Sequence, residues 1–345
     1  MGRRHTTGRD GSMQEGKKIG MVGGDGRMGA AFRVLLRAAD EGIPGLRGAE
    51  FALWGAGFRD ACAGESGARG EDLREAGSFV HGRRAVRCAD PESAVREADA
   101  VILPLPVSRD GIRLNAPGMG DDALRVPEHL RVTELLGLMK PGATVFGGRI
   151  PETAREVCRE RGLFAVDYFE DEAFQIRNAV PTAEGAVAAC IDALPVTVAG
   201  LSCTVLGYGR VGRTLAKRLS ALGAEVTAAA RSPRDLAWAE SDGCVPVPLA
   251  EWRDNPPEHR AVFNTVPAKI LEADTLGRMK RGTVLFDLAP GAEGSVCCGR
   301  DEAERAGIRV IALPSLPGKC APETAGEIIG QAVLSVLAAK KEGRL

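Results

Sequence analysis

The sequence predicts an α/β protein with two doubly wound domains, each built around a parallel sheet. Short apolar runs typical of buried strands alternate with stretches of helical periodicity along most of the chain. A glycine-rich turn follows the first strand of each half, at residues 23–29 and 207–212. Residues 136–146 of the first half also resemble residues 276–286 of the second. We therefore expect two domains of one local plan, joined by a hinge helix, and a C-terminal helix that returns to the first domain.

The bulk composition narrows the class of protein. The 345 residues are enough for two domains with separate cores, and 45 Lys and Arg against 46 Asp and Glu leave a net charge of −1. This balance argues against nucleic acid or a membrane surface as a partner. Nine cysteines at irregular spacing favour a reducing compartment over disulfides or a zinc site, so no metal is expected. The apolar runs are shorter than the about 18 residues of a membrane span, and a cytoplasmic protein is expected.

The first domain is expected over residues 17–181, after a polar leader at residues 1–16 that is expected to be disordered and is no signal peptide. Its strands are expected at residues 18–22, 50–54, 85–88, 100–105, 144–146 and 164–169, and its helices at residues 26–39, 91–97, 132–139 and 152–161. The run at residues 100–105 is apolar throughout, which is typical of a strand buried on both faces of a parallel sheet. Long loops are expected at residues 55–70 and 111–127.

A hinge helix at residues 183–193 is expected to lead into the second domain, which spans residues 182–318. The six strands of this domain are expected at residues 203–206, 225–230, 244–247, 261–264, 283–287 and 308–312. Residues 314–319 are expected to form a rigid return loop. The last segment, residues 319–345, carries a helix at 322–340 with apolar residues at helical spacing, and it is expected to pack back on the first domain.

The second glycine turn carries the clearest functional signal. Gly207, Gly209 and Gly212 lie between a buried strand and a helix, with Arg210 and Val211 among them. The first glycine permits a tight turn, the second lets a diphosphate approach the backbone, and the third lets the helix pack on the strand. The diphosphate would bind the unpaired amides at the start of the helix. The order strand, glycines, helix, strand therefore predicts a dinucleotide-binding, Rossmann-like domain.

The end of the next strand indicates which dinucleotide is bound. An NAD site is expected to have Asp or Glu there, about twenty residues after the glycines, to bind the ribose 2′-hydroxyl. This chain has Arg231 and Ser232 instead, which suit a 2′-phosphate. NADP is therefore expected, with NAD as the second choice and a merely solvated Arg231 as the alternative. The strand-end residues expected to meet the nicotinamide half are Asn264, Thr265, Val266, Pro267 and Ala289.

The first glycine turn repeats the same pattern at Gly24, Gly26 and Gly29. Asp25 would place a carboxylate where a diphosphate should lie, so we expect no nucleotide in the first domain. The start of the helix that follows could instead receive an anionic substrate.

The order of an outer domain, a hinge helix, an inner cofactor domain and a returning helix resembles the D-2-hydroxyacid dehydrogenases. Two features argue against that activity. Those enzymes use a histidine from a late loop as general acid/base, and no histidine here lies beyond the fifth strand of the second domain. The four histidines are His5, His81, His129 and His259. The arginine that binds substrate in those enzymes should follow the strand at 283–287, where this chain has Ala289, Pro290 and Gly291.

The sequence resembles the family of dipicolinate synthase A subunits more closely, over nearly the whole chain after the leader. The residues that carry the resemblance are residues 22–25, Arg27, Asn178, Pro181, Thr182, Glu184, Gly185, and residues 206–210, 230–232, 264–267, 287–289, 316–318, 321–322 and 324–326. The chain departs from the family pattern at residues 55–70 and 111–127, at Pro290 and at the adjacent Cys297 and Cys298.

This resemblance implies a sporulation enzyme that oxidises dihydrodipicolinate to dipicolinate (pyridine-2,6-dicarboxylate) with NADP. It also implies a hetero-oligomer with the B subunit of dipicolinate synthase, in the cytoplasm of the mother cell of a spore-forming bacterium, and a homo-oligomer is a further expectation. Aromatisation of the ring supplies much of the driving force, which suits a site without a late histidine. Two alternatives stay open, a D-2-hydroxyacid dehydrogenase-like oxidoreductase and a non-catalytic scaffold that only binds NADP.

A substrate with two carboxylates requires cations or amide donors around it. The candidate substrate-binding residues are Asp25, Arg27, Arg109, Arg149 and Thr182. The candidate catalytic residues are Glu184, Asp287 and Lys319, with the two carboxylates as candidate bases. Each carboxylate has a structural alternative, because Glu184 could cap the hinge helix and Asp287 could bind backbone amides at the end of its strand.

Overall fold

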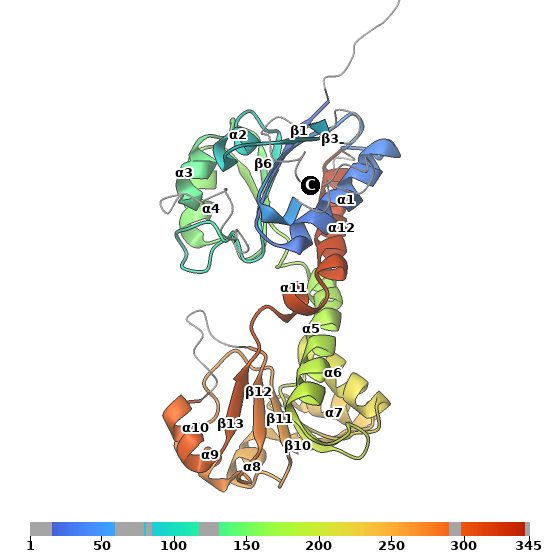
Figure 1. Ribbon diagram of the computed structural model, residues 1–345, viewed down its shortest axis with the longest axis vertical. Helices are drawn as coiled ribbons and strands as arrows, with labels where there is room; N and C mark the ends of the chain where they lie inside the picture. Colours follow the sequence, from blue (N-terminus) through green and yellow to red (C-terminus); the bar gives the residue numbers. More distant parts are fainter. Residues whose placement is uncertain (1–15, 59–78, 81–84, 117–130, 290–297, 342–345) are drawn as a thin grey trace, which may run out of the picture.

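Both predicted parallel sheets are present in the computed structural model, which describes residues 16–58, 79–80, 85–116, 131–289 and 298–341 (Figure 1). The first sheet consists, from edge to edge, of β3 (Phe79–Val80), β4 (Ala85–Arg87), β2 (Glu50–Trp54), β1 (Lys18–Val22), β5 (Ala100–Ile102), β6 (Thr144–Gly147) and β7 (Phe164–Asp167). The second consists of β10 (Val245–Pro248), β9 (Glu225–Ala230), β8 (Ser202–Leu206), β11 (Ala261–Asn264), β12 (Val284–Asp287) and β13 (Arg309–Ala312).

The two sheets share one topology. Apart from β3, which pairs antiparallel with β4 at an edge, each sheet begins at a central strand and winds outward on both sides of it with parallel strands. This is the doubly wound arrangement, and the predicted fold class is confirmed.

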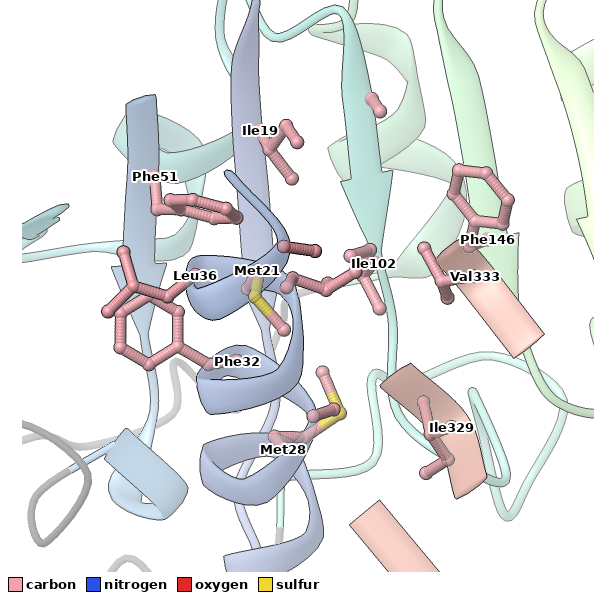
Figure 2. Packing of buried hydrophobic residues seen from close by; sticks show 14 of the residues in the cluster. Ile19, Met21, Met28, Phe32, Leu36, Phe51, Ile102, Phe146, Ile329 and Val333 are labelled. Carbon is pink, nitrogen blue, oxygen red and sulfur yellow. The ribbon is translucent and has the colours of Figure 1, made fainter. Parts of the chain in front are cut away.

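Helices cover both faces of the first sheet. One face packs on α1 (Gly26–Asp40) and α12 (Pro322–Lys341), and Figure 2 shows Phe32 of α1 on the side of Met21 and Val333 of α12 on the side of Ile102 and Phe146. A short 3-10 helix, η1 (Ala56–Phe58), adds to this core. The opposite face packs on α2 (Pro91–Val95), α3 (Val132–Gly137) and α4 (Glu152–Glu160). Burial on both faces explains why these strands read as unbroken apolar runs.

The second sheet is covered in the same way. One face packs on α5 (Glu172–Ala193), α6 (Arg210–Ala221) and α7 (Pro233–Ser241), and the other on α8 (Leu249–Asp254), α9 (Ala273–Arg278) and α10 (Arg300–Ala306). The two similar sequence fragments form the units α3–β6 and α9–β12, which occupy equivalent places in the two domains. The sequence repeat therefore corresponds to a structural repeat.

The C-terminal helix α12 returns to the first domain, as predicted, and lies along α1 (Figure 1). Two glycines allow the close approach of the two helices. A Cβ atom on Gly326 would lie 2.2 Å from the carbonyl oxygen of Arg27, and one on Gly330 would lie 2.8 Å from Cβ of Val34. Since real Cβ atoms do not come this close to other heavy atoms, α12 needs glycine at these positions to pack on α1.

The hinge helix is longer than the sequence predicts. It begins at Glu172 instead of residue 183 and continues through Pro181. Asp171 caps its start by accepting a hydrogen bond from the amide of Phe174 at 2.6 Å. Proline removes one backbone hydrogen bond from a helix, but the hydroxyl of Thr182 donates to the carbonyl of residue 178 at 2.8 Å and keeps this turn together. The predicted start of this helix was wrong, because the helix continues through Pro181, and the expected domain boundary at residues 181 and 182 falls inside α5.

Residues 314–319, predicted as a loop, contain the start of the short helix α11 (Leu316–Cys320). This helix lies between the domains and touches both. A Cβ atom on Gly318 would lie 3.0 Å from Nε of Arg27, and one on Gly185 would lie 2.8 Å from Sγ of Cys320. The predicted leader at residues 1–15, residues 59–70 and 117–127 of the predicted loops, His5, His81, His129, Pro290, Gly291 and Cys297 lie outside the described residues.

Candidate cofactor and substrate site

The cofactor residues lie where the strand order of the second sheet reverses. The chain runs from β8 outward to β9 and β10 and then crosses to β11 on the other side of β8. The glycine turn at 207–212 follows β8, and residues 265–267 follow β11, so the two loops meet at the carboxyl ends of neighbouring strands. Open α/β sheets bind ligands at this switch point.

The three glycines of the turn have different roles. A Cβ atom on Gly207, whose φ is 88°, would lie 2.7 Å from Oγ1 of Thr265, and one on Gly212 would lie 2.1 Å from the carbonyl oxygen of Gly207. These two glycines are therefore required by the fold itself. A Cβ atom on Gly209 would meet nothing within 4 Å in the described part of the chain. Glycine at this position leaves the surface of the turn open for a ligand.

The first turn of α6 presents backbone donors without an internal cap. Gly209 is its N-cap and has no side chain to bond the amides, and the first helical bond is donated by Arg213 to Gly209 at 2.9 Å. The amides of Arg210, Val211 and Gly212 precede that bond and remain available. Bare amides at the positive end of a twelve-residue helix suit a diphosphate, so these residues fit a dinucleotide.

At the equivalent helix start in the first domain, backbone amides are already bonded within the protein. Asp25 caps α1 by accepting from the amide of Arg27 at 3.1 Å, and the amide of Met28 donates to the carbonyl of Asp25 at 3.1 Å. The loop after β2 also packs on this turn, since a Cβ atom on Gly57 would lie 2.0 Å from the carbonyl oxygen of Asp25. This arrangement supports the expectation that no nucleotide binds the first glycine turn.

Arg231 and Ser232 lie at the carboxyl end of β9, beside the glycine turn, as the sequence indicates. Arg231 is exposed and forms no ion pair with another described residue, whereas its neighbour Arg234 is paired with Asp235 at 3.3 Å. Ser232 is the N-cap of α7, yet its hydroxyl makes no cap hydrogen bond. A guanidinium and a hydroxyl at this strand end are thus free to bind an anionic group.

Two polar contacts around the turn were not anticipated from the sequence. The hydroxyl of Tyr208 donates to Asp242 at 3.1 Å, and Asp242 also accepts from Arg213 at 2.7 Å, which holds the pKa of this carboxyl below its usual range. Burial raises the pKa of Tyr208, so it stays a neutral donor. The guanidinium of Arg213 stacks on Trp238 at 3.9 Å. The network ties the glycine turn and α6 to α7 and the turn that follows it.

The second unanticipated contact joins Arg210 of the glycine turn to Glu172, the first residue of α5. Nε of Arg210 lies 2.9 Å from both carboxylate oxygens, and the hydrogen bond from this guanidinium lowers the pKa of Glu172. A pair separated by 38 residues carries no local sequence signal. It links the start of the hinge helix to the cofactor turn.

The strand-end residues of β11 and β12 form a buried pair. Asn264 and Asp287 are opposite each other in the two strands, both are fully buried, and Nδ2 of Asn264 donates to Oδ1 of Asp287 at 2.8 Å. Asn264 also holds Val266 of the following loop, whose amide donates to Oδ1 of Asn264 at 3.1 Å. Pro267 and Ala289 continue the two loops at the same edge.

Arg27 is held at the point where the two domains meet. The residue is 6% exposed, Nε donates to Asp25 at 3.0 Å, and Nη2 donates to the carbonyl of Leu105, beyond the end of β5, at 2.7 Å. Gly318 of α11 covers the side chain from the second domain. The Nη1 group makes no hydrogen bond to a described residue. A guanidinium that is held in place and keeps one terminal nitrogen available is suited to binding a carboxylate.

Arg149 and Arg109 lie on the same carboxyl edge of the first sheet, after β6 and β5. Arg149 has a φ of 56°, an uncommon left-handed conformation, and its amide donates to Asp167 at 3.0 Å. Its exposed guanidinium stacks on Phe169 at 4.6 Å. Arg109 is exposed and unpaired among the described residues. Both cations are accessible at this edge.

The remaining candidates are dispersed. Glu184 faces α6 and pairs with Arg218 at 3.3 Å, away from the glycine turn, and it cannot cap a helix that begins at residue 172. Thr182 uses its hydroxyl inside α5. Lys319, in contrast, is exposed on α11, next to the glycine that contacts Arg27, and makes no described ion pair. The structure places α11, which carries Lys319, against Arg27 and leaves Glu184 apart.

Two kinds of site are not found in the described part of the chain. None of its helices is both long enough and apolar enough to span a membrane. No group of three or more His, Cys, Asp or Glu side chains in that part is placed to hold a metal ion.

Comparison with known proteins agrees with this geometry. Residues 72–169 match the family described as the N-terminal domain of the dipicolinate synthase A subunit, and residues 175–293 match the family described as D-isomer specific 2-hydroxyacid dehydrogenase, NAD binding domain. The second match contains the glycine turn, Arg231 and the residues after β11. The chain is therefore an oxidoreductase with a nicotinamide cofactor bound in its second domain.

Two solved structures are similar over almost the whole chain. Dipicolinate synthase, A chain, from Bacillus subtilis has a TM-score of 0.72 at 25% identity, covering 97% of this chain and 100% of that chain. The dipicolinate synthase A subunit from Bacillus halodurans has a TM-score of 0.74 at 23% identity, covering 95% of this chain and 99% of that chain. A transhydrogenase from Sinorhizobium meliloti shares the fold, with a TM-score of 0.63 at 16% identity over 94% of each chain.

A curated relative completes the comparison. The dipicolinate synthase A subunit of Bacillus subtilis strain 168 is 30% identical over 254 residues, which is 74% of this chain and 82% of the relative. Together with the match of the N-terminal family to the first domain, this likeness shows that the chain belongs to the family of dipicolinate synthase A subunits.

Proposed function

We propose that this chain is the A subunit of a dipicolinate synthase and oxidises dihydrodipicolinate to dipicolinate with NADP. The observation that carries the proposal is the likeness to the Bacillus subtilis relative, which extends over 82% of that protein. We further propose that it works with a second, different subunit in the mother-cell cytoplasm of a spore-forming bacterium, as a hetero-oligomer in which this chain can also self-associate.

The choice of NADP rests on the end of β9. The amides of residues 210–212 would hold the diphosphate, and Arg231 with Ser232 would hold the 2′-phosphate, because these two side chains lie free at the strand end where an NAD site has a carboxylate. When bound, the nicotinamide ring accepts a hydride. The residues of this chain bind and orient that ring against the substrate.

The choice of substrate rests on the charges at the facing edge of the first sheet. Arg27, Arg149 and Arg109 supply cations there for two carboxylates, and Lys319 adds one from α11. Asp25 orients Arg27 and does not contact the substrate itself. Formation of an aromatic ring favours loss of the proton from the ring carbon. That proton passes to water or to a carboxylate.

The histidine that the structure describes is not placed for acid/base catalysis on a 2-hydroxy acid. His259 is the histidine within the described residues, and it precedes β11, at the amino edge of the sheet opposite the glycine turn. Its Nδ1 is engaged by the hydroxyl of Thr204 at 2.9 Å. An alcohol oxidation would need an acid/base imidazole at the carboxyl edge. Oxidation of a dihydropyridine does not.

A coupled spectrophotometric assay tests the proposal. Dihydrodipicolinate is generated in place from aspartate semialdehyde and pyruvate by a dihydrodipicolinate-forming enzyme, and this chain is added with NADP⁺ or NAD⁺, with and without the second subunit. The expected result is formation of NADPH together with pyridine-2,6-dicarboxylate.

Two other outcomes would replace the proposal. Rapid turnover of simple 2-oxo acids with NADPH, and none of dihydrodipicolinate, would identify a D-2-hydroxyacid dehydrogenase. Cofactor binding without turnover, even with the partner present, would identify a non-catalytic scaffold.

A further inference from the structure

Three polar side chains connect the end of β12 to the glycine turn after β8. Asp287 and Asn264 end two neighbouring strands in register, and both are 0% exposed. Thr265 follows Asn264 and reaches the glycine turn. Asn264 and Asp287 are therefore shielded from solvent, whereas Thr265 is half-buried.

Asn264 is oriented by its partners on both sides. Its Nδ2 donates to Oδ1 of Asp287 at 2.8 Å and to the carbonyl of Val266 at 3.0 Å, while its Oδ1 accepts from the amide of Val266 at 3.1 Å. Because Oδ1 of Asp287 accepts this hydrogen bond, the nitrogen end of the carboxamide faces it. The oxygen end then faces Val266. Oδ1 of Asp287 also accepts from the amide of Ala289 at 3.3 Å, which fixes the carboxylate itself.

Thr265 connects the pair of Asn264 and Asp287 to the glycine turn. Its amide and its hydroxyl both donate to the carbonyl of Leu206, at 3.0 Å and 2.9 Å. The hydroxyl oxygen also lies close to where Cβ atoms would stand, 2.7 Å from one on Gly207 and 3.1 Å from one on Gly212. Thr265 therefore fills the space beside the turn. A shift of the loop after β11 would displace it against the backbone that holds the cofactor.

We propose that Asp287 is a positioning residue of the cofactor site, acting through Asn264 and Thr265, and is not the base of the reaction. A carboxylate with no exposed surface, bonded to a carboxamide and an amide, is not placed in this structure to take a proton from a substrate ring. The same hydrogen bonds fix the position of Asp287, which in turn holds the loop that packs on the glycines. This inference concerns the cofactor, so it holds whether or not dihydrodipicolinate is the substrate.

The test compares three variants by fluorescence titration with NADPH and by kinetics. In Asp287→Ala the carboxamide loses its acceptor, and the dissociation constant for NADPH is expected to rise roughly tenfold. Asp287→Asn keeps an oxygen that can accept at the same place, so a smaller rise of roughly threefold is expected, with kcat at saturating cofactor reduced by less than roughly tenfold. The matched control is Asp274→Asn, which neutralises an exposed carboxylate on α9 and is expected to change neither value.

A second pair of variants, in which the two residue types are exchanged between positions 264 and 287, tests the proposal where Asp287→Ala fails to fold. Asn264→Asp places two buried carboxylates together and is expected to abolish NADPH binding. Adding Asp287→Asn restores a donor between the two positions and is expected to recover part of that binding. Loss of turnover in Asp287→Asn by more than roughly a hundredfold, with the NADPH dissociation constant unchanged in all variants, would overturn the proposal and make Asp287 the base. Failure of the wild type to oxidise dihydrodipicolinate would count against the proposed function alone, because NADPH titration needs no substrate.

Discussion

Arg27 and Arg210 occupy equivalent places, in the first turn of the helix that follows each glycine turn. Each guanidinium is held through Nε by a carboxylate, Asp25 for Arg27 and Glu172 for Arg210, and neither Nη1 group bonds another described residue. A carboxylate on one edge of a guanidinium fixes its plane and leaves donors on the other edge. The two domains therefore present similar anion-binding groups, for which we expect different ligands.

Arg27→Lys is expected to weaken binding of pyridine-2,6-dicarboxylate roughly tenfold, because a lysine ammonium cannot bond Asp25, Leu105 and a carboxylate in one plane. The measurement is calorimetric titration of the dicarboxylate in the presence of NADPH. Arg159→Lys, in an exposed pair with Glu152, is the control. An unchanged dicarboxylate affinity in Arg27→Lys would show that this arginine is structural.

Arg231→Ala is expected to raise the NADPH dissociation constant between roughly tenfold and a hundredfold and to leave that for NADH unchanged, because only NADPH carries the 2′-phosphate. Arg234→Ala removes a neighbouring exposed arginine that already pairs with Asp235, and it serves as the control. Parallel losses for NADH and NADPH would contradict a role in cofactor choice.

At the residue scale, the sequence was informative wherever a constraint is local. Gly207, Gly209 and Gly212 could be recognised because a turn of six residues carries the whole requirement. Glu172 and Asp242 could not, because each acts on the turn from a distant segment and an exposed-looking carboxylate has no distinctive spacing. Asp287 is a candidate base from the sequence, but its burial beside Asn264 depends on strand register, which the sequence does not reveal.

At the scale of elements, the glycine turn separates folding from binding. Gly209→Ala is expected to leave the thermal unfolding midpoint nearly unchanged, because φ is −77° and a Cβ atom there meets no described atom within 4 Å. The same methyl group would occupy the diphosphate position, and NADPH affinity is expected to fall at least roughly tenfold. Gly207→Ala is the contrasting variant and is expected to destabilise the fold by about 1–3 kcal/mol. Equal stability losses in the two variants would contradict this division.

The amino edge of the second sheet is expected to be sensitive to acid. Burial lowers the pKa of His259 from 6.5, so the folded protein disfavours the charged ring. The stability contributed by the neutral ring is present above pH 6.5 and is lost as pH falls below it towards the folded pKa. Urea unfolding at about pH 7.5 and about pH 5.5 should show this loss, and His259→Asn, which keeps an acceptor for Thr204, should reduce it. An identical pH dependence in the variant would exclude His259 as the source.

The elements that differ from the sequence prediction are α5 and α11. Both contain proline in a helical turn, Pro181 and Pro317. Proline is costly inside a helix, but burial of Phe174 and Ala179 in α5 and of Leu316 in α11 stabilises the helices around it. Tertiary packing of this kind cannot be inferred from a single sequence, whereas the apolar strands could be placed within a few residues.

At the scale of the whole molecule, the first domain depends on a helix that is distant from it in the chain. The last helix, α12, completes the core of the first domain, and its packing on α1 requires Gly326 and Gly330. The return of this helix was predictable from its length and apolar spacing. The need for glycine at these two positions was not predictable, because the atoms that they contact belong to a segment about three hundred residues away.

Gly326→Ala is expected to destabilise the protein by about 1–3 kcal/mol, because its Cβ atom would lie 2.2 Å from the carbonyl oxygen of Arg27 and the two helices would have to separate. The measurement is thermal or urea unfolding, followed by the tryptophan fluorescence of both domains. Gly277→Ala, in α9 with no described atom within 4 Å of the new methyl group, is the control and is expected to be neutral or slightly stabilising. A neutral Gly326→Ala would mean that α12 is not held closely against α1.

The contact of α11 with Gly185 has a consequence for motion. The chain passes between the domains twice, through α5 and through α11, and these two crossings touch each other on one side of the molecule (Figure 1). Relative movement of the domains is then expected to be a rotation about an axis near Gly185, with the largest displacement on the opposite side. Arg27 packs against Gly318 of α11 and lies close to that axis. It would therefore keep its position at a bound anion while ligands enter and leave on the opposite side.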